Sequence, residues 1–450
     1  MITILGAGLA GISASYHLGH ERCRVFEKSR YPGGHIHSYS QDGCTWDEGP
    51  HVSFTKSDYV RKLFEENTKG RLHEFSAQVS NFYKGHWIPH PAQSHLNSIP
   101  QPVRDQCWND FINSRNAIEP NYVPGNYEEW LLAAFGKSFY ETFSKVYTEK
   151  YWTVSPKLLT TDWVGERVFY PSVIDVEKGY KGIQDRNTHY ITSFRYPDNG
   201  GYFAFAAPMT KGMQTDYGKE LIRISFKERS LFFSDGTNTT YRQLVNTIPL
   251  PELILKSDAP AHVKEAARAL SCSSLLLVNL VLDHEQQRPD HWMYVYDAEK
   301  YSTRISFLEK LSHHNANEGQ SAIQVEVYFS KYKPITTTTE HIATAVTKEL
   351  VEMGLINHEQ AVVAKHTKWV EWANVIFDFQ RNEALDLIFS WLEEFGYNRL
   401  EDELAPMTDW DRRTKKPDGE ITLAGRFAEW KYYWTDDCVL KGKQIGSLCQ

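Results

Sequence analysis

The first eleven residues constrain the fold more than any other part of this 450-residue chain. The apolar run at residues 2–5 predicts a β-strand, and it leads directly into Gly6, Gly8 and Gly11, after which a helix is expected from about residue 12. Gly6 permits a tight turn, Gly8 lets the backbone approach a pyrophosphate, and Gly11 lets the helix pack closely on the strand. This order predicts a Rossmann-like domain that binds a nucleotide.

A second predicted strand ends at Glu27, about twenty residues beyond the glycines, where a carboxylate can accept hydrogen bonds from ribose hydroxyls. Lys28 follows it and is counted with the same site. The next segment carries Gly33 and Gly34, a glycine pair similar to the second phosphate contact of two-dinucleotide-type flavoproteins. The predicted cofactor is therefore FAD.

A later strand indicates that this domain is discontinuous. Residues 244–249 resemble the strand and turn by which such flavoproteins return to the nucleotide domain. The alternative, an NAD(P)-binding Rossmann domain, needs neither this return nor the Gly33 and Gly34 pair.

Composition excludes several classes of partner and location. A net charge of -8, from 49 basic and 57 acidic side chains, gives no attraction for nucleic acid or anionic lipid. The longest apolar runs, such as 274–282, are shorter than the roughly 20 residues that span a bilayer, so no membrane insertion is expected. Six cysteines without metal-ligand spacing favour reduced thiols in the cytoplasm and no metal site.

The spacing of apolar residues along the chain predicts an α/β protein with three kinds of domain. Apolar residues between 126 and 167 recur at helical spacing, with a break at Gly136, and β-rich runs separated by polar turns follow Cys272. Helices are also expected to end at Gly354 and Gly396, flanking the sheet. We predict a discontinuous FAD-binding domain at 1–95, 191–270 and 401–450, a helical substrate or lid domain at 96–190, and an antiparallel sheet domain at 271–400.

Further motifs lie along the chain, namely DEGPHVSF at 47–54, GHWIPHPAQ at 85–93, NYEEW at 126–130, WVGERV at 163–168, FRYP at 194–197 and GRFAEWKY at 425–432. In this order and spacing they resemble the UDP-galactopyranose mutase family, particularly its eukaryotic-type members. The likeness covers nearly the whole chain. The last motif is expected to form a closing strand of the cofactor domain, followed by Asp436 and Asp437 as caps of a final helix.

The most specific match lies between Trp292 and Arg304, which are twelve residues apart, as in that family. The resemblance implies that Trp292 and Tyr294 belong to the active site and that Arg167 and Arg304 hold the substrate diphosphate. Two guanidinium groups suit a diphosphate because they form paired, charge-assisted hydrogen bonds. The alternatives are a salt bridge of Arg167 with Glu166 and an exposed strand position for Arg304.

The resemblance implies the remaining roles: His51 near the isoalloxazine ring, Gln93 and Phe143 at the nucleotide base, Tyr432 at the diphosphate, and Arg426 and Asp436 at the cofactor.

Four positions depart from the family pattern. His90 replaces a tyrosine, Ala92 a phenylalanine and Ile191 an asparagine, and Asn374 stands near the place of another diphosphate tyrosine. These changes affect the base pocket and one substrate contact. The nucleotide and the sugar therefore stay open, with UDP-galactose as the default.

The implied activity is the interconversion of pyranose and furanose forms of a nucleotide-diphosphate sugar, through an adduct of the sugar with N5 of reduced FAD. One alternative is an oxidoreductase similar to amine oxidases or protoporphyrinogen oxidases, whose site would be predominantly apolar. A second is a non-catalytic protein that binds flavin or sugar nucleotide. The source of electrons and the oligomeric state stay open.

Overall fold

The structure of the chain is a computed structural model that describes residues 1–119, 121–165, 168–183 and 192–447. Two predicted site positions, Arg167 and Ile191, lie outside these ranges. Within the described ranges, no helix is both long and apolar enough to cross a membrane.

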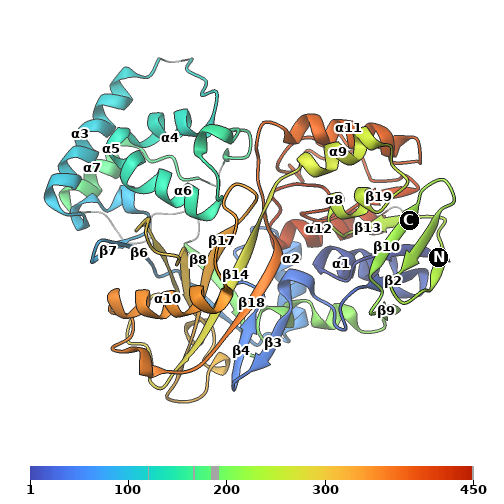
Figure 1. Cartoon of the computed structure of the whole chain (residues 1–450), viewed down its shortest axis with the longest axis horizontal. Helices are drawn as coiled ribbons and strands as arrows, with labels where there is room; N and C mark the ends of the chain where they lie inside the picture. The colour runs from blue at the N-terminus through green and yellow to red at the C-terminus, as the bar shows by residue number, and fades with distance from the viewer. Residues whose placement is uncertain (120, 166–167, 184–191, 448–450) are drawn as a thin grey trace.

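One layer is a five-stranded parallel sheet in the order β19-β13-β1-β2-β9. Its strands are β1 (Ile2–Leu5), β2 (Cys23–Glu27), β9 (Thr215–Tyr217), β13 (Leu244–Asn246) and β19 (Ile421–Leu423). They come from three distant parts of the chain and lie together on one side of the molecule (Figure 1). The predicted Rossmann-like, discontinuous architecture is therefore confirmed.

Helices cover this sheet, and glycines permit their closest approach. Helix α1 (Leu9–Leu18) packs on α12 (Thr435–Gly446), where a Cβ on Gly442 would lie only 2.5 Å from the Cβ of Ser13. Helices α8 (Leu250–Leu255), α9 (Ala261–Ala269) and α11 (Arg381–Glu393) lie beside the same sheet (Figure 1). The prediction that α11 flanks the antiparallel sheet was wrong, because its apolar face packs against α9.

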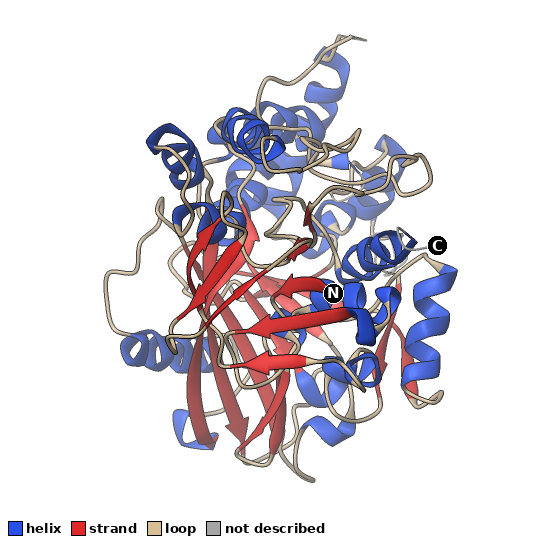
Figure 2. Ribbon diagram, turned by 90° about the vertical axis from the view of Figure 1, so that its right-hand side faces the viewer, coloured by secondary structure: helices blue, strands red, loops and turns tan. Residues whose placement is uncertain are grey.

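The second layer is a seven-stranded sheet in the order β18-β14-β17-β16-β15-β6-β7. Its strands are β6 (Val79–Tyr83), β7 (His86–Pro89), β14 (Cys272–Leu282), β15 (Trp292–Val295), β16 (Arg304–Phe307), β17 (Ser321–Phe329) and β18 (Val362–Val375). All neighbours are antiparallel except β6 and β15. Figure 2 shows long strands side by side in the lower part of the molecule, with most helices above and beside them. The predicted antiparallel sheet is confirmed.

Helix α10 (Thr339–Glu352) covers one face of this sheet, burying Ile342, Val346 and Leu350 against the apolar side chains of β14 and β17. The other face turns toward the rest of the protein. Strands β6 and β7 join this sheet although they belong to the segment 1–95 of the sequence-based division. That division otherwise stays a prediction.

Helices form the third region, at α3 (Gln101–Ala117), α4 (Tyr127–Phe135), α5 (Lys137–Phe139), α6 (Lys145–Tyr151) and α7 (Val173–Lys181), with a π-helical turn at Tyr140–Ser144. Helix α4 ends at Gly136, as predicted. A Cβ there would lie 2.5 Å from the carbonyl carbon of Asp110, so the glycine lets α3 approach.

The remaining elements are α2 (Asp58–Asn67), the hairpin β3 (Ser38–Gln41) with β4 (Cys44–Asp47), the pair β5 (Leu72–Ser76) with β8 (Ser193–Pro197), and the ribbon β10 (Leu221–Ser225), β11 (Ser230–Phe233) and β12 (Asn238–Thr240).

The carboxyl-terminal motif differs from its prediction. Residues 425–430 form turns rather than a strand, and the cofactor-domain strand β19 precedes them. Asp436 and Asp437 lie inside the first turn of α12 instead of before it. There Asp437 accepts a hydrogen bond from the backbone N–H of Trp434 at 2.7 Å.

Candidate functional site

A cavity of about 860 Å³ is lined by all three regions. Its wall includes the turn between β1 and α1, the inward face of the seven-stranded sheet and the helix α6. The predicted site residues that line it are Gly6, Gly8, Glu27, Lys28, Gly33, Gly34, His51, Gln93, Trp292, Tyr294, Arg304, Asn374, Arg426 and Tyr432. The volume is in the range of sites that hold small molecules and cofactors.

One end of the cavity is a wall of bare backbone. The N–H of Gly33 donates to the carbonyl of Ala7 at 2.8 Å, and a Cβ on Gly34 would lie 3.0 Å from the Cα of Gly8. A Cβ on Gly11 would lie 2.0 Å from the carbonyl oxygen of Gly6, so Gly11 permits the packing of α1 on β1. This wall and the N-terminus of α1 suit an anionic group such as a pyrophosphate.

Glu27 is fixed at the same end. Its side chain is buried and accepts hydrogen bonds from the backbone N–H groups of Ala7 at 2.7 Å and Ser29 at 2.8 Å. A carboxylate has about four acceptor sites, so two hydrogen bonds leave capacity for ribose hydroxyls.

Two histidines lie on the cavity wall between the glycines and the large sheet. Burial lowers the pKa of His51 to about 3 and that of His35 to about 4, and the positive charge of Arg426 adds to the effect on His35. Both rings are therefore neutral at pH 7. Because Nδ1 of His51 lies 2.6 Å from the carbonyl oxygen of Gly49, Nδ1 carries the proton and Nε2 is an acceptor.

Arg426 and Asn374 meet across the cavity wall. Nη2 of Arg426 donates to Oδ1 of Asn374 at 2.8 Å, and the hydroxyl of Tyr151 donates to the same oxygen at 3.3 Å. Nε of Arg426 is buried and has no hydrogen-bond partner among the described residues. An unpaired buried donor of this kind suits an oxygen-bearing ligand in the cavity.

Arg304 reaches the cavity from β16 and pairs with Glu326 on the neighbouring strand β17. Nε lies 2.5 Å from Oε2 and Nη2 lies 2.7 Å from Oε1, which is a bidentate pair. Burial disfavours the charge on Arg304, but Glu326 outweighs it, so the pKa of Arg304 stays well above its usual value. The predicted arginine is therefore charged, but it shares its charge with a carboxylate.

Phenol groups surround this pair. The cavity is lined by Tyr147, Tyr151, Tyr294, Tyr328 and Tyr432. Burial raises the pKa of Tyr147, Tyr151, Tyr294 and Tyr328, so these phenols stay protonated and can donate hydrogen bonds. Nε1 of Trp292 donates to the hydroxyl of Tyr294 at 3.1 Å, which joins two predicted site residues.

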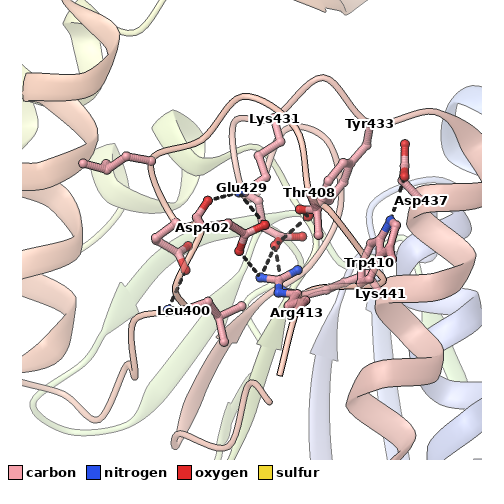
Figure 3. A network of polar contacts seen from close by, with 12 residues as sticks. Leu400, Asp402, Thr408, Trp410, Arg413, Glu429, Lys431, Tyr433, Asp437 and Lys441 are labelled. Carbon is pink, nitrogen blue, oxygen red and sulfur yellow. Dashed lines mark hydrogen bonds and ion pairs between the residues drawn. The ribbon is translucent and has the colours of Figure 1, made fainter. Parts of the chain in front are cut away.

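A buried ion-pair network supports the turn that carries Arg426 and Tyr432 (Figure 3). Glu429 is fully buried and accepts from Nζ of Lys441 at 2.6 Å and from the N–H of Gly425 at 2.9 Å. Asp402 pairs with Arg413 at 3.1 Å and with Lys431 at 3.5 Å. The network therefore ties the turn to α12 and to the segment after α11.

Of the predicted site residues within the described ranges, three do not line the cavity. Phe143 is fully buried, and its ring packs 4.9 Å from Tyr83 and 5.2 Å from Tyr296. Gly11 lies behind the glycine wall, and the Asp436 carboxylate accepts a hydrogen bond from Thr55 at 2.6 Å. The structure therefore does not place Phe143 and Asp436 on the cavity wall, and their ligand contacts stay predictions.

The positions that depart from the family pattern differ in whether they line the cavity. His90 lines the cavity, with Nδ1 at 3.0 Å from Oδ1 of Asn81 and its ring 5.0 Å from that of Tyr294. Ala92 is fully buried and is not among the lining residues, whereas the adjacent Gln93 is.

The sequence-based prediction missed Glu326 and the tyrosines Tyr147, Tyr151 and Tyr328. A signal exists for two of them, because Gln324, Glu326 and Tyr328 alternate with apolar residues in a strand that is buried throughout. A buried carboxylate on a strand needs a cationic partner, and here that partner is Arg304.

The fold is similar to that of a solved structure of reduced UDP-galactopyranose mutase, with a TM-score of 0.88 and 22% identity. The likeness covers 99% of this chain and 94% of that chain. A protein assigned as a protoporphyrinogen oxidase from Exiguobacterium sp. 255-15 gives a TM-score of 0.70 and 16% identity, over 99% and 97% of the two chains. Both likenesses concern the fold.

Sequence relatives are matched over short stretches. The zeta-carotene-forming phytoene desaturase of Myxococcus xanthus is 42% identical over 67 residues, which are 14% of this chain and only 12% of the desaturase. The family model of flavin containing amine oxidoreductases matches residues 9–445, almost the whole chain, and implies a flavin cofactor. The chain therefore belongs to the family of flavin containing amine oxidoreductases.

Proposed function

We propose that this protein interconverts the pyranose and furanose forms of a nucleotide-diphosphate sugar on reduced FAD. The observation that carries the proposal is that one cavity joins the glycine wall to a charged arginine and several protonated phenols. An apolar substrate gains nothing from such donors, and burying them without partners would cost free energy. A diphosphate ester uses them as hydrogen-bond donors.

The residues on the cavity wall suit FAD. The backbone around Gly8 and Gly34 would hold the pyrophosphate, Glu27 the ribose, and Arg426 and His51 the flavin end. When bound and reduced, the flavin supplies a nucleophilic nitrogen for the anomeric carbon of the sugar. His51 is neutral, and its Nε2 can accept a hydrogen bond from a ligand. Because its pKa is lowered to about 3, it is a poor proton acceptor, so the role proposed for it is to position the flavin.

The remaining side chains would act on the diphosphate. Arg304 and the hydroxyl groups of Tyr294 and Tyr432 line the part of the cavity formed by the large sheet and the carboxyl-terminal turn. Their N–H and O–H groups would stabilise the diphosphate as it leaves and hold it until it returns. Arg167 is proposed as the second arginine, on the sequence resemblance.

The sugar nucleotide itself is proposed by default as UDP-galactose. His90 lines the cavity beside Tyr294, so a change in base preference would originate there. The cytoplasmic location is likewise a proposal, supported by six cysteines whose spacing in the sequence is typical neither of a disulfide framework nor of a metal site.

The test is product analysis with reduced and oxidised protein. Dithionite-reduced protein is incubated with UDP-, GDP-, CDP- and dTDP-sugars, and pyranose and furanose forms are separated. We expect conversion of one nucleotide series by the reduced protein alone. Arg304→Ala should lose this conversion while retaining its bound flavin, and loss of the flavin would contradict the role given to Arg304.

A second candidate is an oxidoreductase that takes a hydride from an amine or carbon substrate. The family match favours it, as does the ring-lined cavity, because aromatic faces can hold a cationic amine. The N–H groups of Arg304 and the phenol O–H groups favour a ligand with oxygen acceptors over a cationic amine. Substrate-dependent oxygen uptake without any pyranose to furanose conversion would establish this candidate instead.

A further inference from the structure

We propose that His73, Asp198 and His313 form a binding site for a first-row divalent cation, with Zn²⁺ as the preferred ion. One ligand atom from each side chain lies within 4.8 Å of the others. Nε2 of His73 is 2.9 Å from Oδ1 of Asp198, and the rings of His73 and His313 are 6.4 Å apart. None of the three lines the cavity, so this site is distinct from the proposed active site.

The backbone brings these residues together from three segments of the chain. His73 lies on β5, opposite Tyr196 of β8, and Asp198 follows β8 directly. The N–H of Asp198 donates to the carbonyl of Arg71 at 3.2 Å, and the hydroxyl of Ser312 donates to the carbonyl of Asp198. Ser312 directly precedes His313, so the positions of all three ligands are fixed relative to one another.

The donor set indicates the kind of ion. Two imidazole nitrogens and one carboxylate oxygen suit zinc, whereas calcium and magnesium prefer oxygen ligands alone. Ligands about 2.1 Å from a tetrahedral zinc are roughly 3.4 Å apart, so the observed separations need only small side-chain rotations. His313 is exposed and can rotate. Nε2 of His314, 3.9 Å from Oδ1 of Asp198, or a water would complete the coordination.

Spacing along the sequence could not have shown this site, because its ligands are more than one hundred residues apart. The rival interpretation is an ordinary ion pair between His73 and Asp198. The chain offers such a pair for comparison at His284 and Asp283, where Nδ1 and Oδ1 are 2.7 Å apart. His73 differs in having further histidines facing the same carboxylate.

Zinc bound at this site would stabilise the part of the cavity wall that carries His51. Arg195 on β8 exchanges two backbone hydrogen bonds with Ser53, at 2.7 and 2.9 Å, and Ser53 is two residues from His51. A metal ion bound by His73 on β5, by Asp198 after β8 and by His313 would therefore hold this part of the cavity wall in place. We infer a structural role rather than a catalytic one.

The experiment measures zinc binding by the full-length flavin-loaded protein. After EDTA treatment and its removal, the protein is dialysed to equilibrium against ZnCl₂, and bound zinc is measured by atomic absorption. Thermal unfolding is followed with and without zinc. The variants are His313→Ala, Asp198→Asn and, as the matched control, His284→Ala.

We expect one zinc ion per chain in the wild type and in His284→Ala, and its loss in His313→Ala and Asp198→Asn. At a zinc concentration about 100 times the dissociation constant, the unfolding equilibrium should shift about 100-fold toward the folded state. His313 is exposed, so its variant should fold and show the same melting temperature as zinc-free wild type. Equal zinc binding by all four proteins, or no binding by the wild type, would overturn the proposal.

Discussion

Arg304 and Glu326 face each other across strands β16 and β17 in a bidentate ion pair, with N to O distances of 2.5 and 2.7 Å. The Glu326 side chain is 2% exposed and that of Arg304 is 24% exposed, toward the cavity. Glu326 therefore orients the guanidinium through both hydrogen bonds, and both residues line the cavity. The diphosphate contact proposed for Arg304 depends on this second residue.

Glu326→Gln should weaken both the fold and catalysis. The variant leaves the guanidinium beside an amide, and breaking a buried pair costs about 3 kcal/mol in the free energy of unfolding. Because Arg304 is no longer held in place, kcat/KM for the sugar nucleotide should fall by roughly 10- to 100-fold. Urea unfolding and steady-state kinetics measure the two effects. Unchanged values for both would show that Glu326 does not position Arg304.

Gly8→Ala and Gly11→Ala form a matched pair at the glycine wall. A Cβ on Gly8 meets nothing nearer than 4.0 Å, at the Cα of Gly34, so the variant should fold but obstruct the pyrophosphate position. A Cβ on Gly11 would lie 2.0 Å from the backbone oxygen of Gly6, so that variant should be unstable. Flavin content and the melting temperature of flavin-free protein distinguish the two effects. A Gly8→Ala protein that retains flavin would contradict the proposed cofactor position.

Glu429→Gln should destabilise the turn that carries Arg426. The carboxylate is fully buried against Lys441, so its loss should lower the free energy of unfolding by about 3 to 5 kcal/mol and reduce flavin retention. Glu265→Gln is the control, since Glu265 forms an exposed pair with Arg268 that should contribute less than about 1 kcal/mol. Chemical unfolding of both variants measures the difference. Similar losses in the two proteins would contradict the role of the network.

His51 should make the protein less stable as the pH falls. Its pKa is about 3 in the folded protein and 6.5 when exposed, so between these values the unfolded chain binds a proton that the folded chain does not. The free energy of unfolding should therefore fall as the pH drops below 6.5, and His51 should contribute up to about 1.4 kcal/mol per pH unit to this fall. Above pH 6.5, His51 should contribute no pH dependence. In His51→Asn the slope of the unfolding free energy against pH should be smaller by the contribution of about one bound proton. Parallel curves for the two proteins, from urea unfolding at several pH values, would show that His51 is not buried as a neutral ring.

The local motifs of the fold were predictable because short-range chemistry fixes them. Gly6 has a positive φ of 94°, Gly11 allows the close packing of α1 on β1, and α4 ends at Gly136, so these glycines mark local structure in the sequence. Strand β18 (Val362–Val375) was missed, since it has polar residues at many positions along its length. Its pairing with β14 depends on contacts that the local pattern does not contain.

The site was predictable where a residue type is tied to one function, and less so elsewhere. Arg304, Trp292 and Tyr294 do line one cavity, although sequence spacing alone gives no distance between them. Phe143 shows the opposite case, because an aromatic residue on a buried helix face packs equally well in the core. The pairing of Glu326 with Arg304 was not predictable, because it depends on the register of β16 and β17.

The central claim is that this protein breaks the bond between the anomeric carbon and the diphosphate without net oxidation. The most direct measurement uses UDP-galactose with ¹⁸O in that bridging position and follows the label by ³¹P NMR. We predict that the reduced protein moves the label from the bridge to the non-bridging oxygens of the β-phosphate while its flavin stays reduced. A label that stays in the bridge while the protein oxidises a substrate and consumes oxygen would contradict the account.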